Sequence, residues 1–276
     1  MNPNVPHSLS PVNLILSLFK YRNLIFQMSW REVVGRYKGS ILGLGWSFFN
    51  PIIMLAVYTF VFAIIFKARW GVDGGESRVD FAIILFAGLI IHTFFAEVIN
   101  ASPNMILQNK NYVKKVVFPL EILPFILLGS ALFHAFVSFL VLLIGLFIIK
   151  GTFQWTIIFV PIVILPILFV TIGLSWILAS LGTFLRDISQ SVVILTMVML
   201  FLAPIFYPLN VIPESYHIYI LMNPLTFIIQ QFRDVVIFGN LPNWAGLGMY
   251  FIMSLLVLWI GYAWFQKTRR GFADVL

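Results

Sequence analysis

Apolar residues along this chain gather into long runs that short polar or proline-containing segments separate. Six runs meet or approach the roughly 20 residues that a helix needs to cross the hydrocarbon core of a bilayer. We place these spans at residues 44–66, 81–100, 123–149, 156–185, 191–207 and 244–266. The pattern predicts an all-α, polytopic membrane protein with six transmembrane helices, formed by one membrane domain over residues 1–276.

The segment before the first span has its own pattern. Residues 11–19 and 23–34 carry apolar side chains at helical spacing, with an aromatic and basic border. Such a pattern is typical of an amphipathic helix that lies on the inner membrane surface. We expect residues 1–40 to be cytoplasmic or interfacial, with an interface helix that includes Trp30, Arg31, Glu32, Arg36, Tyr37 and Lys38. The pattern fits a mere anchor and a mechanical role equally well.

The segment 209–243, before the last span, is broken into short pieces by prolines. Its apolar run at 218–229 is too short to cross a membrane, and Asn223 and Pro224 interrupt it. Runs of this length are more often re-entrant or interfacial. We predict two short helices that dip into the membrane from the outside; the alternative is an amphipathic helix on the surface.

Composition supports lipid as the solvent and gives the chain an orientation. Apolar residues make up 61% of the 276 residues and charged residues 10%, which a soluble domain of this length could not bury. With six spans, twelve of the 17 Lys and Arg residues fall on the side of the termini. The positive-inside rule therefore places both termini, including the tail 267–276, in the cytoplasm. We read the charge of +7 as orientation rather than as a sign of nucleic-acid binding.

The motifs of common enzymes are missing from the sequence. It contains no H-E-x-x-H, G-x-S-x-G or D-x-D pattern, no phosphate-binding G-x-x-x-x-G-K-[ST] loop and no cysteine. These motifs supply zinc ligands, serine nucleophiles, sites for metal-bound nucleotide sugars and ATP cradles. We expect neither catalysis nor a cofactor or metal bound by this chain. Any ATP and Mg²⁺ would bind to a partner subunit.

A few side chains within the spans could carry function. An intramembrane histidine is a functional candidate by default, but His92 and His134 are more often residues that hydrogen-bond one helix to another. Tyr58, Phe62 and Phe66 recur at four-residue spacing and could line a pore, although packing or lipid contact explains the spacing better. Acidic residues lie at the span edges, which gives ion coupling little support.

The inner loop 108–119 could dock a partner. Tyr112, Val113, Val116 and Val117 follow a helical i, i+1, i+4, i+5 pattern that gives one apolar side, while Lys114 and Lys115 stay polar. An ordinary positive-inside loop explains the same residues equally well.

Together these segments resemble the membrane subunit of ABC transporters that export bacterial polysaccharides such as O-antigen, capsule and teichoic acid. The resemblance rests on the order and spacing of several blocks, each weak alone: 36–43, 46–51, 109–119 with 121–124, 184–187, 204–208, 223–224 and 233–234.

The resemblance implies a homodimer in the bacterial inner membrane, with two copies of a separate ATPase subunit beneath it. The implied substrate is an undecaprenyl-linked polysaccharide, with O-antigen as the first choice, which would pass through a channel between the protomers. The implied coupling helix comprises Asn111, Tyr112, Val113, Lys114, Lys115, Val116, Val117 and Phe118. The implied outer gate, within 213–238 and its approach, includes Pro204, Tyr207, Pro208, Pro213, Asn223 and Pro224.

Other functions remain open from the residues alone. A related exporter of teichoic acid, capsule, lipid or drugs would share the fold. A membrane glycosyltransferase or acyltransferase is disfavoured by the missing acidic and histidine constellations. An inert scaffold would need neither a docking loop nor a proline-broken outer segment.

Overall fold

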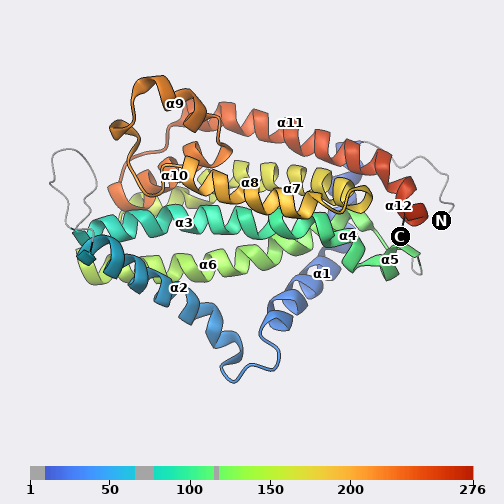
Figure 1. Ribbon diagram of the computed structural model, residues 1–276, viewed down its shortest axis with the longest axis horizontal. Coiled ribbons are helices and arrows are strands. Elements are labelled where there is room, and N and C mark those ends of the chain that lie inside the picture. Colours follow the sequence, from blue (N-terminus) through green and yellow to red (C-terminus); the bar gives the residue numbers. More distant parts are fainter. Residues whose placement is uncertain (1–9, 66–77, 115–117, 276) are drawn as a thin grey trace.

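The computed structural model describes residues 10–65, 78–114 and 118–275, and all regular elements in these ranges are helices (Figure 1). The α-helices are α1 Pro11–Arg36, α2 Trp46–Tyr58, α3 Arg78–Ala101, α4 Met105–Gln108, α5 Lys110–Lys114, α6 Leu123–Lys150, α7 Val160–Phe184, α8 Ile188–Leu202, α9 Glu214–Leu221, α10 Pro224–Arg233, α11 Trp244–Thr268 and α12 Phe272–Val275. Short 3-10 and π segments join them: η1 Gly43–Gly45, η2 Thr59–Ile65, η3 Ser102–Asn104, η4 Leu120–Ile122, η5 Trp155–Phe159, η6 Leu209–Val211, η7 Asp234–Phe238 and η8 Arg269–Gly271. The predicted all-α class is confirmed.

Five helical segments of the described residues are long and apolar enough to cross a membrane. They are Gly43–Phe62, Phe81–Gln108, Leu120–Lys150, Trp155–Phe184 and Trp244–Gly271. They match five of the six predicted spans, so the chain is a polytopic membrane protein.

The predicted span 191–207 corresponds to α8, and its extension to Tyr207 is wrong. Helix α8 has 15 residues and is about 22 Å long at the usual rise per residue, which is short of the roughly 30 Å hydrocarbon core. It ends at Leu202 because Ala203 is extended, with φ −76° and ψ 145°, the conformation that a following proline favours. Six crossings stay a prediction.

Helix α3 forms the centre of the bundle, and α2 its periphery (Figure 1). We compared an apolar stretch of 18 residues in each span. In the span that contains α3, 83% of this stretch is buried, but in the span that contains α2 only 6% is buried. In Figure 1, α2 slants away from the bundle toward its start, where it forms a V with the end of α1. The chain therefore leaves a long apolar face on α2 without a cover of its own.

Glycines allow α7 to pack tightly against its neighbours. A Cβ on Gly173 would lie 2.5 Å from the carbonyl oxygen of Val257 in α11, and Gly261 of α11 faces Gly173 in turn. Gly182 meets the backbone of Pro103 in the same way. Small residues let helix backbones approach closely, which is how helices associate in lipid.

The two ends of the bundle differ. Helices α1 and α12, the first and last that the structure describes, lie with α5 at one end of the bundle, and α9 lies at the opposite end (Figure 1). Helix α1 is one continuous helix that crosses its end of the bundle, where the sequence predicted two helical stretches. Arg36 is its last residue, so Tyr37 and Lys38 of the predicted interface helix lie in the turn that follows.

The two short helices predicted before the last span are present as α9 and α10. Tyr216, Ile218 and Tyr219 of α9 are exposed, whereas Ile228, Ile229 and Phe232 of α10 are buried. Helix α10 thus packs into the bundle and α9 covers its end.

Candidate translocation and coupling sites

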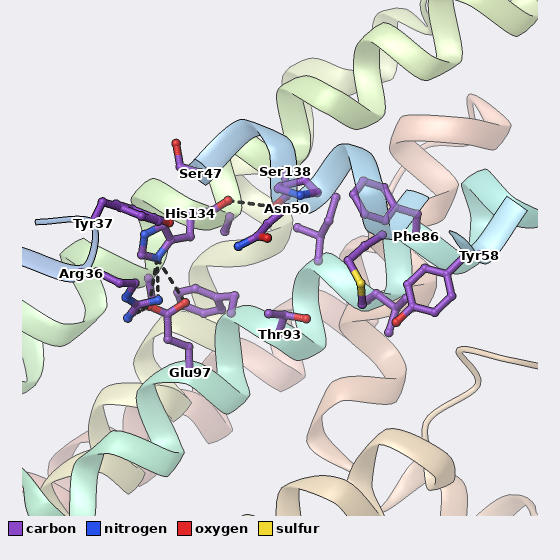
Figure 2. A pocket seen from close by; sticks show the side chains of 17 residues that line it. Arg36, Tyr37, Ser47, Asn50, Tyr58, Phe86, Thr93, Glu97, His134 and Ser138 are labelled. Atoms are coloured by element: carbon purple, nitrogen blue, oxygen red, sulfur yellow. Dashed lines mark hydrogen bonds and ion pairs between the residues drawn. The ribbon is translucent and has the colours of Figure 1, made fainter. Parts of the chain in front are cut away.

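A cavity of about 230 Å³, which we call the polar cavity after the charged cluster at one end, lies between the end of α1, one face of α2, and the helices α3 and α6 (Figure 2). Its polar and aromatic lining residues are Arg36, Tyr37, Ser47, Asn50, Tyr58, Phe86, Thr93, Phe94, Glu97, His134 and Ser138. Intramembrane polar groups usually face a bundle interior or a water-filled path. This cavity is therefore the strongest candidate for a place where a hydrophilic molecule meets the chain.

Three charged or titratable side chains converge at one end of this cavity. The Arg36 Nη2 atom lies 2.7 Å from Glu97 Oε1, and His134 Nδ1 lies 3.0 Å from the same oxygen. Arg36 Nη1 is also 3.3 Å from His134 Nδ1. The cluster joins α1, α3 and α6, so it fixes the end of the interface helix to the bundle (Figure 2).

The same cluster leaves one hydrogen-bonding atom of the cavity wall unused. His134 Nε2 is buried and has no partner among the residues that the structure describes. An unmet buried polar group carries a desolvation cost of about 1–3 kcal/mol.

The histidines also behave as the helix-to-helix residues that the sequence favoured. His134 connects α6 to Glu97 of α3, and His92 Nε2 lies 2.9 Å from the carbonyl oxygen of Thr196 in α8. Among the described residues, no three His, Cys, Asp or Glu side chains gather in a way that could hold a metal ion.

The predicted coupling helix contacts the interface helix. Arg31 Nη2 donates to the Tyr112 hydroxyl over 3.4 Å, and the Tyr112 ring stacks on Phe118 with centroids 4.5 Å apart. Asn111 is exposed on α5. The side chains of Val113 and Lys114, and all of Lys115, Val116 and Val117, lie outside the described structure, so the predicted apolar side stays a prediction.

We call the inner loop 108–119 the coupling loop, after the coupling helix predicted in it. Glu121, just after this loop, connects it to α1 and to the C-terminal segment. Its Oε2 accepts from Arg269 Nη1 at 2.7 Å, and its Oε1 accepts from the Ser17 hydroxyl at 3.1 Å. Arg269 also donates to the carbonyl oxygen of Phe118 over 3.1 Å. The coupling loop is thereby fastened to α1 and to the C-terminal segment.

Of the remaining predicted interface residues, Trp30 meets Phe133 of α6 edge-on at 5.9 Å, while Glu32 and Lys38 are exposed. Tyr37 meets His134 edge-on at 6.0 Å. The interface helix is therefore packed on α6 by aromatic rings, in addition to its ion pair.

The aromatic stripe of the first span divides between two environments. Tyr58 lines the polar cavity, whereas Phe62 packs against Phe81 and Phe206 at 5.8 and 6.0 Å. Phe66 lies outside the described residues. A channel-lining role for the stripe stays a prediction.

The predicted outer-gate residues mark the ends of short helices. Asn223 caps α10 through Leu225 N and donates to the carbonyl oxygen of Met199 over 2.9 Å, and Pro224 begins α10. Tyr207 donates to the carbonyl oxygen of Phe201 over 2.7 Å. Pro213 is exposed before α9, Pro208 is half-buried, and Pro204 is buried.

The count of basic residues placed Arg233 among the five on the outer side, and its burial was not predicted. Arg233 is buried at the end of α10 and donates to the carbonyl oxygens of Ile84, Pro204 and Ile205 over 2.9, 2.5 and 3.2 Å. Gly88 of α3 leaves the space for its guanidinium. The positive-inside rule treats every basic residue between spans as exposed. An arginine inside an apolar stretch, however, usually faces the bundle interior, and this was the available sign that Arg233 is buried.

The Arg36–Glu97–His134 cluster was likewise missed as a unit. The sequence pattern placed the acidic residues at span edges and His134 within a span, but nothing in the separation of Glu97 and His134 along the chain brings them together. A lone carboxylate in a long apolar helix was the available signal, because such a group almost always has a partner.

Comparison with known proteins gives concordant relatives. The family model described as ABC-2 type transporter matches residues 23–237. The O-antigen export system permease protein RfbA of Myxococcus xanthus is 27% identical over 266 residues, covering 95% of this chain and 99% of that protein. A protein of the same name from Klebsiella pneumoniae is 26% identical over 258 residues, covering 92% and 95%. The polysialic acid transport protein KpsM of Escherichia coli is 25% identical over 249 residues, covering 87% and 92%.

Proposed function

The chain belongs to the ABC-2 type transporter family, and from this membership we propose that it is the channel-forming subunit of an ATP-driven exporter of lipid-linked polysaccharide. Permeases of this family work with a separate ATPase subunit, so the chain is a transporter subunit and not an enzyme. ATP and Mg²⁺ would bind to that partner, in keeping with the missing phosphate-binding loop in the sequence.

The proposed substrate class follows from the relatives. Proteins named for O-antigen export and for polysialic acid transport are similar to this chain over most of its length. Both substrates are polysaccharides. O-antigen is the first choice because the relatives with that name have higher identity and cover more of this chain; capsule-type polysaccharide is the second. An undecaprenyl-linked form would present both a polar head and an apolar tail to the permease.

One observation carries the mechanism: a single helix touches both the coupling loop and the polar cavity. On α1, Arg31 bonds to Tyr112 and Arg36 bonds to Glu97. These two arginines are five residues apart, about 7.5 Å along a helix axis. A push on the coupling helix would therefore reach the cavity through a rigid element. We propose that ATP-driven movement of α1 opens this cavity to the polar head of the substrate.

A homodimer would cover the exposed apolar faces. On α2, Ile53 and Val57 are exposed, and on α8, Ile194 and Met197 are exposed. Both helices pack on α3, which suits a channel built where two copies of α2, α3 and α8 meet. Two protomers would bind two ATPase subunits, one at each coupling loop.

Placement in the bacterial inner membrane with cytoplasmic termini completes the proposal. The basic residues favour that orientation, and α1, α5 and the C-terminal α12 lie at one end of the molecule (Figure 1). The ATPase would then bind at that end, and α9 and α10 would face the outside.

The test is gene replacement in the bacterium of origin, with surface polysaccharide analysed by gel electrophoresis and lipid-linked polysaccharide measured in the cytoplasmic membrane. Deletion should abolish surface polysaccharide and cause the lipid-linked form to accumulate inside, and the wild-type gene should restore export. An Arg31→Ala variant should reduce export while the amount of this protein in the membrane stays normal. Arg22→Ala is the matched control, because Arg22 lies on the same helix and bonds only locally, to Phe19.

Several outcomes would contradict the proposal. Normal surface polysaccharide after deletion would exclude a role in its export, and loss of the lipid-linked form itself would indicate an enzyme of synthesis. The chain has no native cysteine, so single cysteines at Ile53 or Ile194 can test the dimer by disulfide crosslinking. If neither position yields a crosslinked dimer, this interface is rejected.

A further inference from the structure

A second, wholly apolar cavity lies on the other side of the α3 and α6 contact. It has a volume of about 550 Å³, and its lining residues include Phe94, Ala135, Phe136, Ile158, Ile164 and Phe232. These residues come from α3, α6, η5, α7 and the end of α10. We call this space the apolar groove.

The apolar groove opens to the outer surface of the bundle. Phe136 and Ile158 at its edge are 59% and 72% exposed. Both belong to segments long and apolar enough to span a membrane, so the surface around them faces lipid. The groove is thus continuous with the interface between protein and bilayer, and Trp155, also exposed, stands at the start of η5 as an interfacial aromatic.

Its lining excludes polar occupants. Every lining side chain is aliphatic, aromatic or proline, and water needs polar partners to occupy a cavity. An apolar cavity of about 150 Å³ already accepts benzene, and the groove is several times larger, within the roughly 300–1,000 Å³ of ligand pockets. Left empty, its walls would lose dispersion contacts. The neighbouring solvent that can fill it is hydrocarbon.

We propose that the apolar groove binds one acyl chain of a membrane phospholipid. The chain lies between α6 and α7, with its inner portion against Phe94 and Ala135. At the α10 side it contacts Phe232, which meets Phe139 with ring centroids 5.8 Å apart. The lipid thereby supports the buried helix of the outer segment.

The groove and the polar cavity share a wall. Ile90, Phe94 and Ala135 line both spaces, so an acyl chain in the groove limits how far these residues can move away from the polar cavity. The bound lipid is a structural neighbour of the polar cavity, whatever substrate that cavity takes.

The experiment uses the chain purified with its ATPase subunit and reconstituted with phosphatidylethanolamine that carries a diazirine in one acyl chain. After illumination, peptide mass spectrometry locates the labelled residues. Label should concentrate on the groove residues of α6 and α7, above the level on the exposed face of α11, which lies outside the proposed dimer interface. The variant Ile164→Trp, which fills the groove, should lower that labelling several-fold, with labelling of α11 unchanged. Ile252→Trp, on the exposed face of α11, is the matched control and should leave groove labelling at the wild-type level.

Three results would overturn the proposal: groove labelling no higher than on the exposed face of α11, equal groove labelling in wild type and Ile164→Trp, or displacement of the label by a polyprenyl phosphate but not by excess unlabelled phospholipid. The last result would assign the groove to an isoprenoid chain. If Ile164→Trp does not assemble, Ile164→Ala enlarges the groove and should keep or raise the labelling; a loss of labelling there overturns the proposal. None of these measurements depends on which polysaccharide is exported.

Discussion

Removing the charge from Glu121 or from Arg269 should loosen the C-terminal segment from the coupling loop. The two groups are 2.7 Å apart, and their side chains are 13% and 16% exposed. At an effective dielectric constant of 20, the attraction of two unit charges at this distance is about 6 kcal/mol. Desolvation of both groups offsets much of it.

The net value lies between two known cases. Exposed ion pairs contribute about 0–1 kcal/mol, and removal of one partner from a buried pair costs about 3–5 kcal/mol. Because both side chains keep a little contact with solvent, we expect a coupling free energy of about 2 kcal/mol between them.

A double-mutant cycle of Glu121→Gln and Arg269→Gln measures this value, because Arg269 also bonds to Phe118 and a single variant would mix the two effects. Unfolding can be followed in mixed micelles by tryptophan fluorescence, since the indole of Trp176 donates to the carbonyl oxygen of Glu121 over 3.2 Å.

Arg270→Gln, next to the paired arginine and exposed, is the control and should change stability little. A coupling free energy below about 0.5 kcal/mol, the usual scatter of independent sites, would refute the reasoning that this pair holds the segment in place.

Three other changes test the remaining contacts. Gly173→Val should sharply lower the amount of folded chain on gel filtration, because its Cβ would lie 2.5 Å from the α11 backbone. Gly248→Ala is the control and should not lower it, because the space around Gly248 is open. Equal yields of the two variants would contradict the tight contact between α7 and α11. Arg233→Lys should lower the thermal midpoint by several degrees in detergent, because an ammonium cannot reproduce the planar fork that meets three carbonyls; an unchanged midpoint would argue against the clamp. Glu97→Gln should reduce export at a normal chain level, measured as surface polysaccharide, because Arg36 loses its carboxylate; full export would remove the cluster from the mechanism.

Much of the fold could be read from periodicity. Long apolar runs dictate helices, since in lipid the backbone must satisfy its own hydrogen bonds, and the five long spans and the two short helices α9 and α10 follow from that. The end of α8 was misplaced, although Pro204 stood in the sequence. The apolar run continues to Tyr207, but the helical backbone ends at Leu202. Pattern alone also could not join residues 11–36 into one helix.

The sites divide in the same way. The sequence by itself determined that lipid surrounds this chain and that its fold is all-α, because both depend on composition and local spacing. Only the tertiary structure decided that Arg36, Glu97 and His134 meet, that Arg233 is buried rather than exposed, and that an apolar groove adjoins the polar cavity. Those features are contacts between helices distant along the chain, and helix packing, not spacing, sets which side chains face one another.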